Sequence, residues 1–236
     1  MFKIALTAGH YRYTAGKRCL KKLDKNETRE WVLNDRIADK IEKLLSSYEG
    51  YRLIRTDDTS GERCIEIEER VKAANDFDAD VYISIHHNAG ICGGKGGGIV
   101  AYTCKGCQAE SKEWQKELYN ALIGQTGLKG NRASPLAESN LYEVKKTKMP
   151  AVLLELGFMD SATDVPVILT EEYADNCAKA ITQVIVKRGG LTKKPEAKTL
   201  YRVQVGAFYL RENADALAKE LKGKGYKTLI KEDVTG

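Results

Sequence analysis

The stretch IEERVKAANDFDADVYISIHHNA, residues 67–89, decides the fold, because it passes from a helix pattern to a strand pattern and ends on polar side chains. Its first half repeats apolar residues every three or four positions, as one face of a helix does. The apolar run 81–85 then predicts a buried strand, followed directly by His86 and His87. In an open parallel sheet, residues at the carboxyl ends of the strands line one crevice. The stretch therefore predicts an α/β fold with its functional site at that edge.

Strand patterns and helix patterns alternate along residues 1–188, which predicts an open, twisted, mainly parallel sheet flanked by helices. We expect strands at 3–7, 51–55, 81–85, 98–102 and 151–155. The apolar stripes of the expected helices are Leu33, Ile37, Ile41 and Leu45; Ile67, Val71 and Ala74; Trp114, Leu118 and Leu122; and Tyr173, Cys177, Ile181 and Val184. Each stripe is the face by which a helix would cover the sheet.

The segment GGLTKKPEAK, residues 189–198, combines glycines, charges and a proline, which is typical of a linker. It divides a main domain, 1–188, from a tail, 199–236. The tail pattern predicts a small β-α-β unit, with strands at 201–207 and 227–231 and a helix at 213–224 whose cap is Asn213. A unit of this size cannot bury enough apolar surface to be stable alone.

Composition and charge limit the classes of protein to which the chain could belong. The chain has 236 residues, 42% of them hydrophobic, so one substantial globular domain and a small appendage are expected. No apolar run is long enough to span a bilayer, and the first residues are typical of a strand and not of a signal peptide. We therefore expect synthesis in the cytoplasm without a signal peptide, and no insertion into a membrane. The residues after 188 carry ten Lys and Arg against six Asp and Glu, which favours an anionic partner such as a bacterial wall or nucleic acid.

Only three histidines occur in the chain, and all of them follow predicted strands. His10 follows the first strand, and His86 and His87 follow the strand VYISI. Glu30 begins a predicted helix, where a carboxylate is favoured by the helix dipole. Two imidazoles and one carboxylate can hold zinc and leave a fourth position open for water, which is typical of a catalytic site.

Glu155 ends another predicted strand and has leucines on both sides. A carboxylate in such a run is costly to bury without a partner. It could serve as a base beside a metal, taking a proton from water and returning it to a leaving amine, which is amide hydrolysis. The plainer alternative is an ion pair with an arginine such as Arg55 or Arg70.

Five motifs in order carry a family resemblance: TAGH, ending at His10; EWVLNDRIA, with Glu30 and Asn34; LIRTDD; the stretch 67–89; and KMPAVLLELGFMD, with Glu155. With these motifs, residues 1–188 resemble the zinc-dependent N-acetylmuramoyl-L-alanine amidases of the Amidase_3 type. That resemblance implies cleavage of the amide bond between N-acetylmuramic acid and L-alanine in peptidoglycan. Two departures stand out: Ala8-Gly9-His10-Tyr11 replaces the usual Pro-Gly-His-Gly, and Met159-Asp160 replaces Ser-Asn, a change expected to matter little.

The resemblance also implies roles for individual residues. His10, Glu30 and His86 would bind Zn²⁺, and Glu155 would be the catalytic carboxylate. Two further matches are Asn88 and Arg70, whose role, structural or in substrate contact, stays open. His87 stands where the family usually has another residue type, so it would either lie behind the zinc ligands or face the substrate.

The tail resembles the beginning of a SPOR domain, a module that binds septal peptidoglycan, through YRVQVGAF and RENADALAKELKGKGYKTLI. The second half of the module is missing, so two chains could complete one module and form a homodimer through their tails. Truncation or a poorly folded remnant are the alternatives. Peptidoglycan, and not nucleic acid, is the expected partner. Together with the expected lack of a signal peptide, this favours a phage or prophage endolysin that acts on the wall after release.

Other readings remain open. A zinc carboxypeptidase-like peptidase could use a similar His-Glu-His set, and a non-catalytic wall-binding protein could keep the fold alone. Six cysteines in a chain without an export signal favour free thiols, although Cys104-x-x-Cys107 could be a redox pair. The glycine-rich segment 93–98 lacks the Lys-Ser/Thr of a phosphate loop, so a flexible loop at the rim of the site is expected.

Overall fold

The computed structural model describes residues 1–195, 201 and 203–233. Two compact units divide the chain, Met1–Lys194 and Pro195–Gly236. Residues 196–198 of the predicted linker, residues 199, 200 and 202 of the predicted tail and the last three residues lie outside the described part. Within that part, no helix combines the length and the apolar character that a membrane crossing requires.

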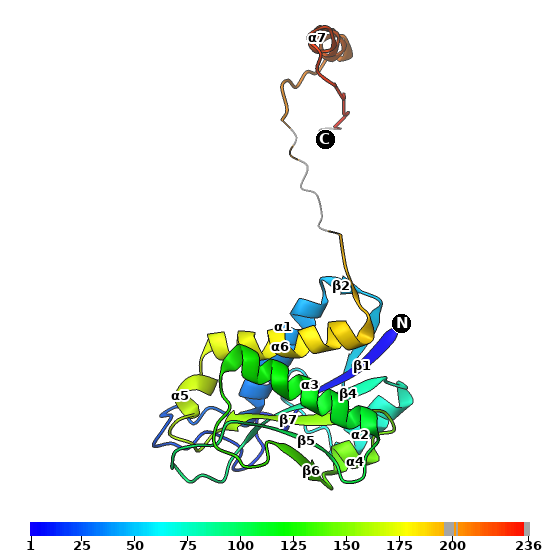
Figure 1. The fold of residues 1–236 in the computed structure, drawn as a ribbon. Helices are drawn as coiled ribbons and strands as arrows, with labels where there is room; N and C mark the ends of the chain where they lie inside the picture. Colours follow the sequence, from blue (N-terminus) through cyan, green and yellow to red (C-terminus); the bar gives the residue numbers. More distant parts are fainter. Residues whose placement is uncertain (196–200, 202, 234–236) are drawn as a thin grey trace. The chain divides into compact units, whose positions relative to one another are not determined.

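A six-stranded sheet lies at the centre of the first unit (Figure 1). Its strands, in spatial order, are β3 (Tyr51–Arg55), β1 (Phe2–Ala8), β4 (Val81–Asn88), β7 (Ala151–Phe158), β5 (Ile99–Cys104) and β6 (Leu136–Ser139). The first four strands are mutually parallel; β5 runs antiparallel to β7, and β6 runs parallel to β5. The prediction of a mainly parallel α/β sheet is therefore confirmed.

Helices cover both faces of the sheet because residues along each strand alternate between the faces. On one face lie α1 (Glu30–Leu45), α3 (Ala109–Thr126) and α6 (Glu171–Gly189), which share one hydrophobic core with alternate residues of β1, β4, β5 and β7. On the other face, α2 (Ile67–Asp76) and α4 (Tyr142–Lys146) enclose a smaller core around Tyr82. A short helix, α5 (Val165–Ile168), follows β7. The predicted apolar stripes are buried, apart from Ile67 and its 37% exposed side chain.

Part of the predicted linker belongs to the main unit. Helix α6 ends at Gly189, and the chain then forms β8 (Thr192–Lys193), which pairs antiparallel with β2 (Tyr48–Glu49). The first compact unit consequently extends to Lys194, beyond the expected boundary at 188.

The β-α-β prediction for the tail is wrong in its strands. Helix α7 (Arg211–Gly223) forms, but it begins after Leu210 and is not capped by Asn213. The described residues of 201–207 and 227–231 form no strand. An isolated strand has no partner for its backbone N–H and C=O groups. No residue of α7 is buried, so the described residues of the tail offer no sheet or core to stabilise strands.

Candidate metal centre and active site

Three predicted ligands come together at the carboxyl ends of the parallel strands. His10 follows β1, Glu30 is the first residue of α1, and His86 lies near the end of β4. Among the described residues, each offers one ligand atom, and these atoms lie within 4.8 Å of one another. Oε1 of Glu30 lies 3.2 Å from Nε2 of His10 and 3.1 Å from Nδ1 of His86. Positions 10, 30 and 86 of the sequence therefore form one cluster.

Gly9 allows the two histidines to approach each other. A Cβ atom at position 9 would lie 2.1 Å from Cε1 of His86, so any side chain there would overlap the imidazole. The Gly9 amide donates to the carbonyl of Ile85 at 2.8 Å, which continues the β1–β4 pairing. His10 then takes a left-handed conformation with φ 68°. The loop keeps its glycine, and with it the ligand, despite Ala8 in place of proline.

Glu155 lies beside this cluster. It is aligned with His86 across the β4–β7 pairing. Its Oε2 atom is buried and has no hydrogen-bond partner among the described residues. Burial, opposed in part by His86, raises the pKa of Glu155 to about 7. A carboxyl group with this pKa can accept and return a proton near neutral pH.

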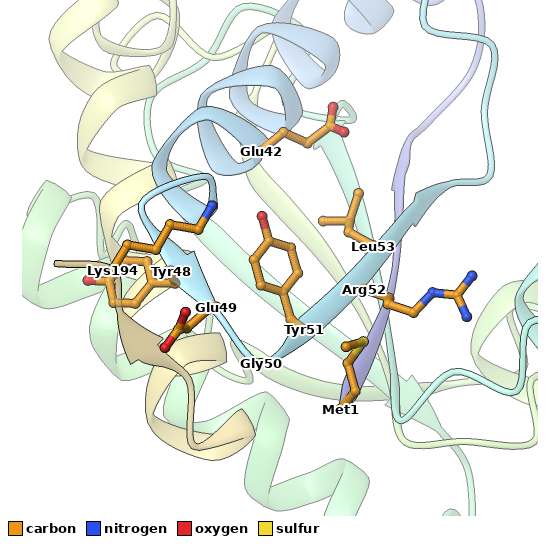
Figure 2. Close-up of a pocket in the computed structure, with 9 residues that line it drawn as sticks. All are labelled: Met1, Glu42, Tyr48, Glu49, Gly50, Tyr51, Arg52, Leu53 and Lys194. Atoms are coloured by element: carbon orange, nitrogen blue, oxygen red, sulfur yellow. The ribbon is translucent and has the colours of Figure 1, made fainter. Parts of the chain in front are cut away.

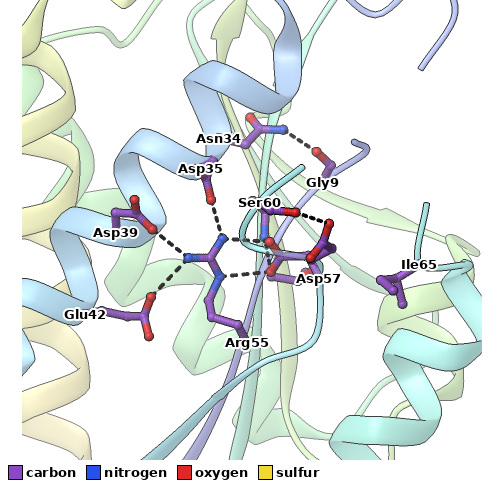
Figure 3. Close-up of polar contacts among 12 residues, drawn as sticks. Gly9, Asn34, Asp35, Asp39, Glu42, Arg55, Asp57, Ser60 and Ile65 are labelled. Atoms are coloured by element: carbon purple, nitrogen blue, oxygen red, sulfur yellow. Dashed lines mark hydrogen bonds and ion pairs between the residues drawn. The ribbon is translucent and has the colours of Figure 1, made fainter. Parts of the chain in front are cut away.

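Neither arginine that could have neutralised Glu155 does so. Arg55 is surrounded by carboxylates from α1 and from Asp57 (Figure 3). Arg70 donates to backbone carbonyl oxygens of Ile65, Ala8 and His10. The ion-pair alternative for Glu155 is therefore wrong.

Arg70 and His87 lie behind the ligands and do not face open solvent. Arg70 is 4% exposed, and its guanidinium holds the carbonyl oxygens of Ala8 and His10 at 2.7 Å. His87 is 1% exposed, and its Nδ1 lies 2.7 Å from Oδ1 of Asn34. Asn34 in turn donates to the carbonyl of Gly9 at 3.1 Å (Figure 3). Burial lowers the pKa of His87 to about 3, so its ring is neutral.

Hydrogen bonds to the chain after β7 hold Asn88, the residues that follow it and the glycine-rich segment 93–98. The Asn88 carbonyl accepts from the Met159 amide at 2.8 Å. Oδ2 of Asp160 accepts from the amides of Gly90, Ile91 and Cys92 at 2.7–2.9 Å. One carboxylate oxygen of Asp160 therefore holds three consecutive amides, and the expectation that the change from Ser-Asn matters little stays a prediction. Asp164 similarly accepts from Gly98 at 2.7 Å, so the segment expected to be a flexible rim loop is tied down.

The residues of the cluster fit a divalent metal ion. Burial opposes the ionised form of Glu30, but His10 and His86 keep its pKa well below the usual range. Oε2 of Glu30 is buried and has no hydrogen-bond partner among the described residues. Two imidazoles and carboxylate oxygens are a donor set that suits zinc.

Comparison with known families identifies the family of the first unit. The family model described as N-acetylmuramoyl-L-alanine amidase matches residues 4–187, which include the three predicted ligands and Glu155. The chain belongs to this amidase family. A second model, described as SPOR domain, matches residues 174–236.

Related sequences and structures extend this assignment. The chain is 29% identical to the sporulation-specific N-acetylmuramoyl-L-alanine amidase of Bacillus subtilis (strain 168), over 87% of this chain and 77% of that protein. It is 28% identical to the endolysin of Bacillus phage SPP1, over 69% of this chain and 62% of the endolysin. The catalytic domain of CwlV, an amidase from Bacillus (Paenibacillus) polymyxa, has the same fold, with a TM-score of 0.70 and 24% identity over 80% of this chain and 98% of that domain.

Two further residues lie beside the candidate site of this amidase and were not predicted from the sequence. Lys17 places Nζ 3.5 Å from Oε2 of Glu30. Glu143, on α4, places Oε2 3.6 Å from Nε2 of His86 and accepts a hydrogen bond from Tyr82 at 2.6 Å. Burial opposes its ionised form, yet His86 and Tyr82 lower the pKa of Glu143 to about 2. Neither residue lies in an apolar pattern or at a strand end that could have marked it.

A pocket and a cysteine pair lie at the amino ends of the parallel strands of this amidase, away from the candidate site. An open pocket is lined by Met1, Tyr51 and Lys194 among others, next to the amino ends of β1 and β3 (Figure 2). Cys104 ends β5, which runs antiparallel to β7, so Cys104 and Cys107 are also remote from Glu155. The geometry therefore does not connect the cysteine pair with the metal cluster.

Proposed function

We propose that the chain is a zinc-dependent peptidoglycan hydrolase that cleaves the amide bond between N-acetylmuramic acid and L-alanine. Membership of the amidase family supports the bond and the substrate. One observation carries the proposal of a metal mechanism: His10, Glu30 and His86 present ligand atoms within 4.8 Å of one another, beside Glu155, whose Oε2 has no hydrogen-bond partner among the described residues.

In the proposed mechanism, His10, Glu30 and His86 would hold the zinc ion. Zinc at such a site acts as a Lewis acid, which lowers the pKa of water and polarises the carbonyl of the scissile amide. Glu155 takes the proton from the attacking water as the new C–O bond forms. It then gives that proton to the nitrogen of L-alanine as the C–N bond breaks. The pKa of about 7 suits Glu155 to both transfers.

The place of action and the role of the tail are part of the same proposal. The SPOR match supports binding of the tail to peptidoglycan. A phage endolysin among the relatives supports an enzyme that is made in the cytoplasm and reaches the wall after release. We also propose that two tails complete one module, because a single tail leaves the apolar residues Val203, Val205 and Leu229 exposed.

The substitution Glu155→Gln tests the mechanism. We expect amidase activity on purified peptidoglycan to fall at least about 100-fold, because an amide cannot take the proton from water. Zinc content should stay at one ion per chain, since Glu155 is not a ligand in the proposed site. A matched control is Glu138→Gln, which removes a carboxylate that pairs with Lys112 on the surface. Full activity of the Glu155 variant would contradict the mechanism.

A further inference from the structure

Glu143 is a buried carboxylate beside the metal centre that the proposed mechanism does not use. It lies on the short helix α4 and is 4% exposed. A buried carboxylate is costly unless hydrogen-bond donors surround it. The groups around Glu143 therefore indicate its role.

Three residues of β4 face the carboxylate of Glu143. The hydroxyl of Tyr82 donates to Oε1 at 2.6 Å, and the hydroxyl of Ser84 donates to the same oxygen at 3.3 Å. Oε2 lies 3.6 Å from Nε2 of His86. Residues 82, 84 and 86 alternate along the strand and so share one face of the sheet. The carboxylate lies along that face, and one of its oxygens points to the imidazole.

The two ring nitrogens of His86 face different carboxylates. Nδ1 faces the metal centre and lies 3.1 Å from Oε1 of Glu30. Nε2 is buried and has no hydrogen-bond partner among the described residues, but Oε2 of Glu143 lies only just beyond hydrogen-bond distance. Histidines that bind a metal through one nitrogen almost always donate the other N–H to a carboxylate, a carbonyl or water. That second bond fixes the tautomer and the direction of the ring.

We propose that Glu143 is a positioning residue for His86: its carboxylate accepts the Nε2–H group and keeps the lone pair of Nδ1 directed at the zinc ion. The inference rests on the proposed zinc site. It explains why a carboxylate is buried on α4, where a residue that only packed against the sheet would be apolar. Loss of such a partner typically weakens metal binding about 10- to 100-fold.

Zinc affinity of the full chain, measured by competition with a chromophoric chelator, tests the inference. We expect Glu143→Leu to weaken zinc binding about 10- to 100-fold, and Glu143→Gln to weaken it less, because the amide oxygen still accepts a hydrogen bond but carries no charge. Glu117→Gln is the matched control. It removes a carboxylate that pairs with Lys187 and Arg188, away from the site, and should leave zinc affinity unchanged.

Nitrogen-15 NMR of histidine-labelled protein reports which ring nitrogen carries the proton, a property that a change in packing alone would not alter. The chain has only three histidines to assign. In the zinc-loaded wild type, Nε2 of His86 should carry the proton and Nδ1 should show the shift of a metal-bound nitrogen. The hydrogen-bonded Nε2–H signal should be lost in Glu143→Leu. If Glu143→Leu does not fold, the zinc affinity of Glu143→Gln tests the role of Glu143 instead.

The outcomes separate this inference from the proposed function. A wild type that binds one zinc, together with folded Glu143 variants of equal affinity, would overturn the role of Glu143 and leave the zinc mechanism standing. A wild type that binds no zinc would overturn both.

Discussion

At the scale of single residues, the site depends on one close approach between backbone and ring. The missing side chain of Gly9 leaves room for the His86 imidazole, whose three nearest ring atoms would lie 2.1–2.4 Å from a Cβ atom there. Rotating the His86 imidazole about its Cβ–Cγ bond would not remove the overlap, because three ring atoms would lie this close to the Cβ atom. The ligand geometry therefore requires glycine at position 9.

The substitution Gly9→Ala should displace His86 and weaken zinc binding by at least about 10-fold, with a loss of about 1–3 kcal/mol in the free energy of unfolding from the forced overlap. Gly124→Ala is the matched control. Gly124 lies in α3, and nothing lies within 4 Å of a Cβ atom at that position. The control should keep full zinc affinity and gain about 0.5–1 kcal/mol. Chelator competition and urea unfolding measure both quantities, and a Gly9→Ala protein with wild-type zinc affinity would contradict the geometry.

Several of these residues could be predicted from the sequence because their positions follow from strand ends. His10, His86 and Glu155 each follow or end an apolar run, and parallel strands bring such ends together. Glu143 could not be found in this way, because α4 has five residues and no apolar periodicity. The importance of Asp160 was likewise invisible, since its partners are backbone amides about 70 positions away.

At the scale of elements, Arg55 joins β3 to α1 and to the end of β1. Its side chain is 5% exposed, and its guanidinium lies 2.6–3.1 Å from carboxylates of Asp35, Asp39, Glu42 and Asp57 (Figure 3). Oδ1 of Asp57 also accepts from the amide of Ala8 at 3.0 Å. This network fixes the helix that begins with Glu30 against the strand that precedes His10.

Replacing Arg55 with alanine should cost about 3–5 kcal/mol in the free energy of unfolding, because the fully buried carboxylate of Asp57 would lose its counter-charge. Asp39→Ala removes a partner whose side chain is 60% exposed and should cost no more than about 1 kcal/mol. Urea unfolding of the two variants compares them directly. Equal stabilities would mean that the network contributes little.

The main elements were predictable wherever apolar periodicity was strong, and were missed where it was absent. The strand β6 has four residues, Leu136–Ser139, that alternate between exposed and half-buried, so the sequence shows no run of apolar residues there. For the tail the sequence pattern predicted strands that the structure does not contain among the described residues. Its strand-like runs are strong in sequence, but a strand also needs a neighbouring strand, which local pattern cannot supply.

At the scale of the whole molecule, the chain consists of an amidase unit and a tail that matches a SPOR domain. All proposed ligands, Glu155 and the hydrophobic core lie in Met1–Lys194. Folding and chemistry should therefore depend on the first unit, and attachment to the wall on the second.

A protein that ends at Lys194 should unfold at the same temperature as the full chain and hydrolyse soluble muropeptides at the same rate. Its binding to purified peptidoglycan sacculi, measured by co-sedimentation, should be weaker than that of the full chain. Light scattering of both proteins tests the proposed tail-mediated dimer, which should be absent after truncation. Loss of activity on the soluble substrate would contradict the division of roles.

The most direct test of the central claim is to digest purified peptidoglycan and assay new peptide N-termini and new reducing sugars, with and without a zinc chelator. We expect new N-terminal L-alanine and no new reducing ends. The product should be lost when the chelator is present and should return when zinc is restored. New reducing ends, or new N-terminal alanine that still forms in the presence of the chelator, would contradict a zinc amidase built on His10, Glu30, His86 and Glu155.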